Sequence, residues 1–174
     1  MCGIAGILDS TAKCPPQNDE LKAMQHAMRH RGPDGDGLWI SPKGNVGLAH
    51  VRLAIIDLSA KAAQPMNDGR DKVWITFNGE IYNHVSLRKK LENVGRSFVS
   101  DHSDTEVLIH GYLEWGIDGL LARIEGMFSF AIWDCEHKKL LMARDRIGIK
   151  PLYFTKTNGR FIFASEIKAI LTNP

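Results

Sequence analysis

The chain begins MCGIAGIL, an apolar run in which a cysteine directly follows Met1. This run predicts a strand over residues 2–8, and its glycines at positions 3 and 6 allow neighbouring backbones to approach closely. A small buried cysteine at such a place is usually inert. Cysteine is also small enough for Met1 to be removed, which would leave Cys2 with both a thiol and a free α-amine.

These two groups on Cys2 would suit nucleophilic catalysis. An α-amine titrates near pH ~7.7–8.0 and a thiol near pH ~8.5, so both lie close to working pH. A terminal amine can serve as the base for a neighbouring nucleophile without a separate histidine. Taken alone, Cys2 favours the inert interpretation, and the other motifs of the chain reverse that preference.

Length, charge and cysteine content exclude several classes. A chain of 174 residues suits one domain, and its net charge of +2 gives no case for nucleic acid or an anionic membrane. No apolar run has bilayer length, and no signal-peptide pattern is present. The cysteines, Cys2, Cys14 and Cys135, lack disulfide or zinc spacing, which favours a reducing cytoplasm. His26 and His30 have no third ligand, so no metal site is predicted.

Apolar periodicity predicts a mixture of helices and strands. Helices are expected over residues 17–29, 84–94 and 103–116, with a short one after Glu166. The last of the three long helices starts with Ser103 and Glu106 at capping-box spacing. Strands are expected over residues 38–40, 45–50, 51–58, 72–77, 126–133, 139–143, 152–155 and 160–164. Such a pattern predicts two stacked sheets with helices outside.

Two charged residues are candidates for binding a ligand. Arg52 interrupts the apolar run 51–58, where an unpaired guanidinium would be costly. It either meets a carboxylate of the protein or binds one on a ligand, which its planar fork matches bidentately. Asp104 lies in the first turn of an expected helix, where the helix dipole alone explains it, and it could equally receive a ligand ammonium.

Two segments rich in glycine and polar residues have two interpretations each. Asn78-Gly79 is a strong signal for a tight turn, which the local sequence favours. The alternative is an oxyanion hole, in which the Asn78 amide and the Gly79 N–H point together at a developing negative charge. The segment HRGPDGDG, residues 30–37, predicts a structured turn that either ends a helix or packs beside Cys2.

Seven motifs in order carry a resemblance that covers essentially the whole chain. After the MCGIAG start, they are RGPDG at 31–35, HVRLAIID at 50–57, FNGEIYN at 77–83, SDTE at 103–106, GMF at 126–128, ARDRIGIKPLY at 143–153 and FASEIKA at 163–169. Together they resemble the glutamine amidotransferase domain of asparagine synthetases, of the class II, N-terminal-nucleophile type. Each motif is weak alone, but their order along one chain is very specific.

The resemblance implies a fold and a set of roles. The fold is α+β, a four-layer αββα sandwich of two mainly antiparallel sheets, as a single domain over residues 1–174. Cys2 is the nucleophile, with its α-amine as base. The other implied roles are oxyanion donors at Asn78 and Gly79, a carboxylate ligand at Arg52, an ammonium ligand at Asp104 with backbone groups of Gly79 or Glu80, and a pocket border at Leu53, Ile55 and Ile56.

The resemblance also implies a reaction and its partners. Glutamine is hydrolysed to glutamate and ammonia through a glutamyl thioester, and the ammonia passes to a synthetase domain or subunit. The SGGxDS phosphate signature of that domain is absent here, so no cofactor is expected in this chain, and ATP and Mg²⁺ belong to the missing part. A homodimer stays open, as does the ammonia acceptor. The alternative function is a non-catalytic glutamine-binding or docking module.

Overall fold

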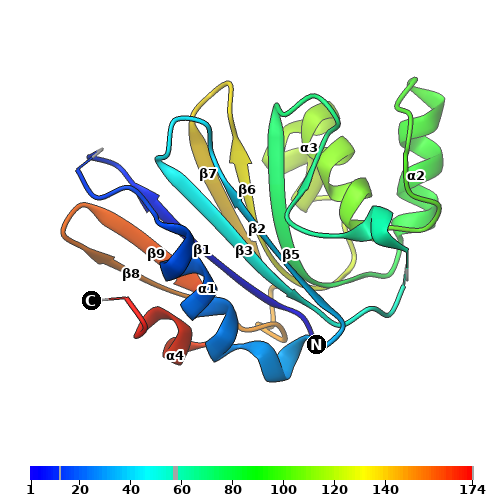
Figure 1. Cartoon of the computed structure of the whole chain (residues 1–174). Coiled ribbons are helices and arrows are strands. Elements are labelled where there is room, and N and C mark those ends of the chain that lie inside the picture. Colours follow the sequence, from blue (N-terminus) through cyan, green and yellow to red (C-terminus); the bar gives the residue numbers. More distant parts are fainter. Residues whose placement is uncertain (12, 57–58, 174) are drawn as a thin grey trace.

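The computed structural model describes residues 1–11, 13–56 and 59–173. Two antiparallel sheets stack face to face, and helices cover both outer faces (Figure 1). The first sheet has the order β2-β3-β1-β9-β8: Gly35–Ile40, Val46–Arg52, Gly3–Asp9, Arg160–Ala164 and Tyr153–Thr157. The second has the order β4-β5-β6-β7: Met66–Asn67, Val73–Ile81, Gly126–Asp134 and Lys139–Arg144.

The helices divide between the two sheets. Helices α1 (Asn18–Ala27) and α4 (Ile167–Ile170) contact the first sheet, and α3 (Asp104–Leu121) contacts the second and also packs on α2 (His84–Asn93). Short 3₁₀ turns lie at Arg29–Arg31 and Ala60–Ala62. The predicted α+β, four-layer αββα architecture is therefore confirmed.

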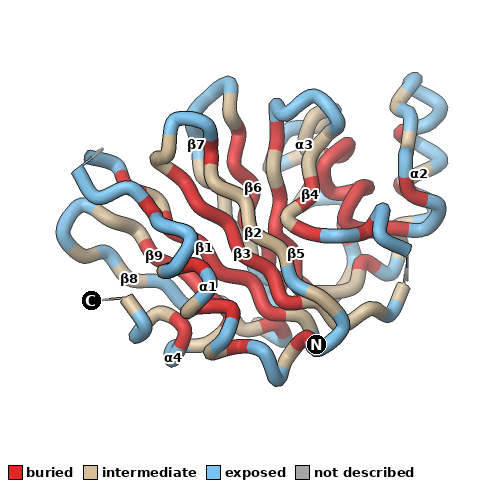
Figure 2. Tube along the Cα trace, in the orientation of Figure 1, coloured by how far each residue is buried: buried red, intermediate tan, exposed pale blue. Residues whose placement is uncertain are grey.

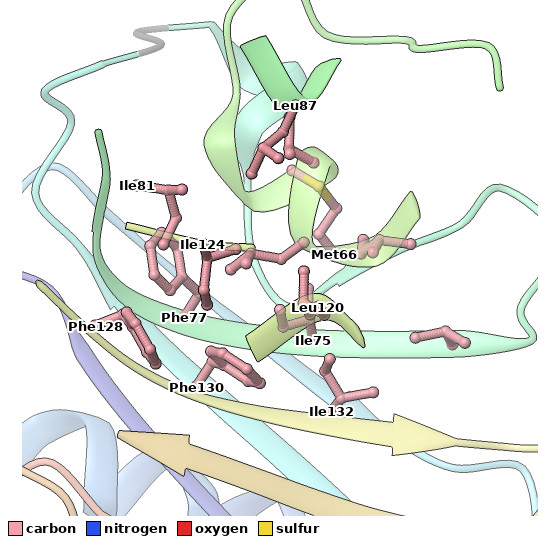
Figure 3. Packing of buried hydrophobic residues seen from close by; sticks show 14 of the residues in the cluster. Met66, Ile75, Phe77, Ile81, Leu87, Leu120, Ile124, Phe128, Phe130 and Ile132 are labelled. Atoms are coloured by element: carbon pink, nitrogen blue, oxygen red, sulfur yellow. The ribbon is translucent and has the colours of Figure 1, made fainter. Parts of the chain in front are cut away.

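Three apolar clusters fill the spaces between the layers, and buried residues follow the central strands (Figure 2). Between the sheets, Ile4, Leu48, Trp133 and Phe163 interlock. The largest cluster lies between the second sheet and its helices, where aromatic and branched side chains of β5 and β6 meet those of α3 (Figure 3). Because side chains alternate along each strand, each sheet has one apolar face toward the other sheet and one toward its helices.

The predicted first strand is confirmed, and as β1 it is the centre of the first sheet. It pairs with β3 on one side and β9 on the other. A Cβ on Gly6 would lie 2.5 Å from the Phe163 ring and 2.8 Å from the Gly47 carbonyl oxygen, so only glycine fits there. Cys2 therefore directly precedes a largely buried strand, whose position is set by neighbours on both sides.

The predicted strand over residues 51–58 is wrong. Strand β3 ends at Arg52, and residues 53–56 are irregular, while residues 57 and 58 lie outside the described part of the chain. The backbone leaves the sheet because other groups bind its amides: the Asp34 carboxylate accepts from Ala54 N at 2.9 Å, and Leu53 N approaches Cys2 Sγ at 3.4 Å. An apolar run here lines a pocket instead of forming a strand.

The tight turn favoured for Asn78-Gly79 is also wrong. Both residues lie within β5 and pair with Ser129 and Phe128 of β6. A Cβ on Gly79 would lie 2.3 Å from the Met127 carbonyl oxygen, so close strand approach, and not turn geometry, requires this glycine. Long-range pairing therefore overrides the local turn signal.

The helix predicted from Ser103 begins at Asp104 as expected, but not through a capping box. Ser103 makes no side-chain cap hydrogen bond. Glu106 instead accepts hydrogen bonds from Val99 N at 2.7 Å, from Ser100 N at 2.8 Å and from the Ser100 hydroxyl. The helix continues beyond its predicted end at Gly116, where φ of +66° marks a kink. Glu106 therefore fastens the preceding loop to the helix.

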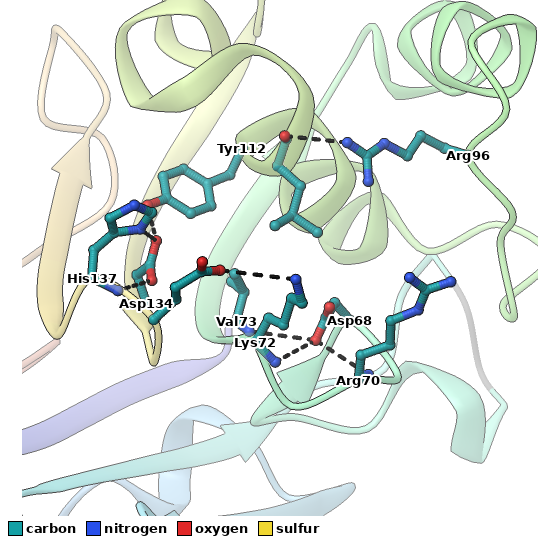
Figure 4. A network of polar contacts seen from close by, with 10 residues as sticks. Asp68, Arg70, Lys72, Val73, Arg96, Tyr112, Asp134 and His137 are labelled. Carbon is teal, nitrogen blue, oxygen red and sulfur yellow. Dashed lines mark hydrogen bonds and ion pairs between the residues drawn. The ribbon is translucent and has the colours of Figure 1, made fainter.

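A polar network closes the far end of β6 (Figure 4). The buried Asp134 carboxylate accepts from the Tyr112 hydroxyl at 2.6 Å and from His137 N at 2.7 Å. Burial raises the pKa of Asp134, but these hydrogen bonds outweigh it and hold the pKa below its usual range. Tyr112 thus links α3 to the β6–β7 hairpin.

We expect Tyr112→Phe to lower the free energy of unfolding by about 1–3 kcal/mol, because a buried carboxylate loses a charged hydrogen bond. Urea denaturation would measure this loss. Tyr153→Phe is the matched control, since Tyr153 is exposed on β8 and its loss of a hydroxyl should change stability by less than about 0.5 kcal/mol. Equal stability of the two variants would contradict a structural role for the network.

Candidate active site

One pocket gathers every site residue that the sequence predicts. It opens at the end of the molecule where β1 begins and β3 ends, beside the N-terminus in Figure 1. The predicted residues that line it are Cys2, Arg52, Leu53, Ile55, Ile56, Asn78, Gly79, Glu80 and Asp104. They come from both sheets, from the segment after β3 and from the start of α3, so folding alone brings them together.

The Cys2 thiol is held at the pocket by the segment after β3. Its Sγ lies 3.5 Å from the Leu53 carbonyl oxygen, to which it donates, and 3.4 Å from Leu53 N. Burial raises the pKa of this thiol above its usual value, and the Leu53 backbone and nearby positive charge offset only part of that increase. The thiol is therefore protonated at neutral pH and needs a base before it can attack.

Arg31 packs beside Cys2, which agrees with the second interpretation of the segment at residues 30–37. The prediction that the whole segment is a turn is wrong, because residues 35–37 belong to β2 and pair with β3. Arg31 Nε donates to the Cys2 carbonyl oxygen at 2.9 Å, and Arg31 Nη1 lies 2.9 Å from Glu166 Oε1. Burial raises the pKa of Glu166, but Arg31, Lys168 and His30 lower it overall to about 2. An ionised carboxylate thus orients the arginine that fixes the backbone of Cys2.

Asn78 and Gly79 present two hydrogen-bond donors to the pocket. Asn78 is buried, and its Nδ2 has no partner among the described residues. Phe77 N donates to Gln64 Oε1 at 2.6 Å, and Ile81 N donates to Asp104 Oδ2 at 3.0 Å, both away from β6. Because amide direction alternates along a strand, the Gly79 N–H between them points to the same side. Both residues line the pocket, so these two groups are the candidates for the oxyanion donors that the sequence predicts.

Arg52 and Asp104 supply opposite charges to the same pocket. Arg52 stands at the end of β3, half-buried, with Nη1 donating to the Ser59 carbonyl oxygen at 3.0 Å. Asp104 is 5% exposed, and burial raises its pKa to about 6 despite the hydrogen bond from Ile81 N. A zwitterionic amino acid carries the two complementary charges, a carboxylate and an ammonium.

The raised pKa of Asp104 predicts a pH limit on ligand binding. An ammonium pairs with the carboxylate but not with the neutral acid, so affinity for a free amino acid should fall about tenfold per unit below pH 6 and stay flat above it. Calorimetric titration of glutamine into Cys2→Ala would measure this without turnover. Asp104→Asn is the control and should bind weakly at every pH in that range. If glutamine bound Cys2→Ala with the same affinity above and below pH 6, this would contradict the pairing of Asp104 with the ligand ammonium.

Several polar residues near the pocket escape prediction from sequence. Gln64 accepts from Phe77 N and donates to Thr105 Oγ1 at 3.2 Å, which ties β5 to the start of α3. His50 Nε2 lies 3.1 Å from the Phe77 carbonyl oxygen, and burial lowers the pKa of His50 to about 4, so it is neutral. Gln64 belongs to no motif, and His50 opens the HVRLAIID motif without a predicted role, although a histidine within an apolar strand is a weak signal.

Other kinds of site find little support in the described part of the chain. Its histidines, cysteines and carboxylates form no group of three or more that could hold a metal ion. Cys2, Cys14 and Cys135 are all free thiols. None of its helices has the length and apolar character needed to cross a membrane.

Comparison with known proteins agrees with the geometry of this pocket. All of residues 1–174 match the glutamine amidotransferase domain family, and the chain belongs to that family. It is 40% identical over its whole length to asparagine synthetase [glutamine-hydrolyzing] 3 of Bacillus subtilis, and 42% identical to asparagine synthetase [glutamine-hydrolyzing] 2 of the same organism. The chain spans only 28% and 23% of the length of these two relatives.

A solved structure shares the fold. Glutamine phosphoribosylpyrophosphate amidotransferase from B. subtilis, complexed with ADP and GMP, superposes with a TM-score of 0.82 at 24% identity. The match covers 98% of this chain and 43% of that one. The two chains therefore share one fold, which is the predicted αββα sandwich.

Proposed function

We propose that this chain is the glutaminase part of a glutamine-dependent asparagine synthetase or a related amidotransferase. One observation supports this most strongly: a half-buried thiol, an amide donor with no partner among the described residues, and an arginine and an aspartate all line one pocket. The charged pair suits the α-carboxylate and α-ammonium of a free amino acid. The thiol and the donors suit attack on a carbonyl at the far end of its side chain.

The first half of the reaction uses Cys2 after removal of Met1. The α-amine accepts the thiol proton, and Sγ attacks the side-chain amide carbon of glutamine, whose C=O electrons move to oxygen. Asn78 Nδ2 and Gly79 N donate hydrogen bonds to this oxyanion. The C–N bond then breaks, the α-ammonium returns its proton to the departing nitrogen, and ammonia leaves. A γ-glutamyl thioester remains on Cys2.

The second half regenerates the thiol. The α-amine takes a proton from water as the water oxygen attacks the thioester carbonyl. The same two donors stabilise the second oxyanion, the C–S bond breaks, and Sγ recovers the proton. Glutamate is then released from Arg52 and Asp104. No step requires a residue outside the pocket.

The fate of the ammonia lies outside these residues. We propose that a synthetase domain or subunit receives it, because the matched segment covers only 28% and 23% of the length of the two relatives. Amidation there would use ATP and Mg²⁺ held by that part. Aspartate is the acceptor that the names of the relatives suggest. We also propose a cytoplasmic location and a homodimer.

A silent binding module is the second candidate, since Met1 lines the pocket and Cys2 has no free α-amine while Met1 is present. Glutamate release from glutamine by the purified chain, with intact mass measured on the same sample, separates the two. Release with Met1 absent supports the glutaminase. Glutamine protection of Cys2 from alkylation, without release and with Met1 absent, supports the binding module. A sample that retains Met1 is first treated with methionine aminopeptidase.

A further inference from the structure

Lys150 is a buried cation beside the N-terminus. The residue is 5% exposed and lines the same pocket as Cys2 and Arg52. Its Nζ lies 3.3 Å from Met1 Sδ, and among the described residues no carboxylate approaches it within ion-pair distance. A thioether is a weak partner for an ammonium, and a buried charge with only such a partner is costly. This cost indicates a function for the charge.

The backbone of Lys150 is held independently of Met1. The Asp145 carboxylate accepts from Lys150 N at 3.0 Å and from Ile149 N at 2.8 Å, while Arg144 Nε donates to the Lys150 carbonyl oxygen at 2.6 Å. Asp145 also accepts from Phe128 N, which lies in β6. The loop is therefore fastened to the second sheet. The backbone of Lys150 therefore stays in place when the methionine leaves, and its side chain continues to extend from a fixed point beside the pocket.

Removal of Met1 would turn its peptide link into the free α-amine of Cys2, and Cys2 lines the same pocket as Lys150. A positive charge close to an amine disfavours the protonated form of that amine. The amine must be neutral to accept the thiol proton in the proposed reaction. A fixed cation at this place therefore keeps the base in its working form.

We propose that Lys150 is a positioning residue that keeps the Cys2 α-amine neutral once Met1 is removed. This inference rests on the proposed glutaminase function. Lys150 acts through the amine and contacts neither the thiol nor the clamp residues in any hydrogen bond of the described chain. Its role is electrostatic, so an arginine can replace it and a neutral side chain of similar length cannot.

Other charged groups around Cys2 are already engaged or act on the thiol. Arg52 and Asp104 influence the thiol with opposite signs. Among the described residues, the other charged or titratable groups around the pocket include Arg31 and Glu166, which pair with each other, Asp145, which binds backbone amides, and Glu80, which lines the pocket. His84 acts on Asp104, and His50 is neutral. Among these groups, Lys150 is the cation whose hydrogen-bond partner, Met1 Sδ, is lost when Met1 is removed.

The test compares Lys150→Met, Lys150→Arg and Lys139→Met as a function of pH. Lys139 is exposed at the far hairpin and loses the same charge without touching the pocket. We expect the acid limb of kcat/KM for glutamate release to move upward by about one pH unit in Lys150→Met, with the alkaline plateau kept. That shift is about a tenfold loss on the acid limb. Lys150→Arg and Lys139→Met should keep the original limb.

A second measurement reads the amine without turnover. The ¹⁵N shift of the Cys2 α-amine, in protein labelled with [¹⁵N]cysteine and shown by mass to lack Met1, gives its titration midpoint directly. The midpoint should rise by about one unit in Lys150→Met alone. An unchanged midpoint overturns the inference even if activity falls. A shifted midpoint in a protein that releases no glutamate would uphold the inference and reject the proposed function.

Discussion

Cys2→Ala should release no glutamate from glutamine above the rate in buffer, because the chain then lacks the sulfur that forms the thioester. Glutamine binding should persist, since Arg52 and Asp104 do not depend on the thiol. Removal of a nucleophile typically costs several orders of magnitude in turnover. Coupled glutamate detection, with calorimetric binding on the same preparation, measures both quantities.

Cys14→Ala is the matched control for this change. Cys14 is an exposed free thiol in the loop before α1, so its removal should leave turnover unchanged. Cys2→Ala should also lose the mass increase that a glutamine-derived thioester or an alkylating glutamine analogue adds to the native chain. Substantial turnover in Cys2→Ala would reject Cys2 as nucleophile. Loss of both turnover and binding would indicate a damaged pocket.

The first strand was predictable because its signals are local. The apolar run after Met1 and the two glycines that permit close packing are contiguous in sequence, and β1 follows them within one residue. Arg52 and Asp104 could be recognised as charges in unusual places, but not assigned a partner. Their proximity in the pocket depends on strand order and on the packing of α3, which no local pattern encodes.

The errors share one physical cause, which is competition from distant partners. Asn78-Gly79 forms a turn only when no strand pairs with these residues, and here both of them pair with β6. Residues 53–56 have strand composition, but Cys2 Sγ binds the amide of Leu53 and the Asp34 carboxylate binds that of Ala54. Glu106 has capping spacing, but it receives better donors from the preceding loop. In each place a hydrogen bond to another segment of the chain replaces the structure that the local pattern predicts.

Asn78→Ala should lower kcat by about 100- to 1000-fold with little change in KM, because one of two oxyanion donors is lost. Asn78 contributes nothing to the proposed contacts of the ground-state amino acid, whose charged groups lie at Arg52 and Asp104. The free energy of unfolding should change little, since Asn78 Nδ2 has no hydrogen-bond partner to lose among the described residues. Urea denaturation would confirm that the variant is folded.

A glutamine analogue with an aldehyde in place of the amide sharpens this prediction. The aldehyde forms a tetrahedral adduct with a cysteine thiol, and this adduct resembles the transition state. The affinity of the analogue should therefore track kcat/KM. Its affinity should therefore fall in Asn78→Ala by about the same factor as kcat/KM, while glutamine affinity in the Cys2→Ala background is kept. Asn93→Ala, at the exposed end of α2, is the control and should change neither. Equal weakening of the aldehyde and of glutamine would mean that Asn78 shapes the pocket and does not stabilise the oxyanion.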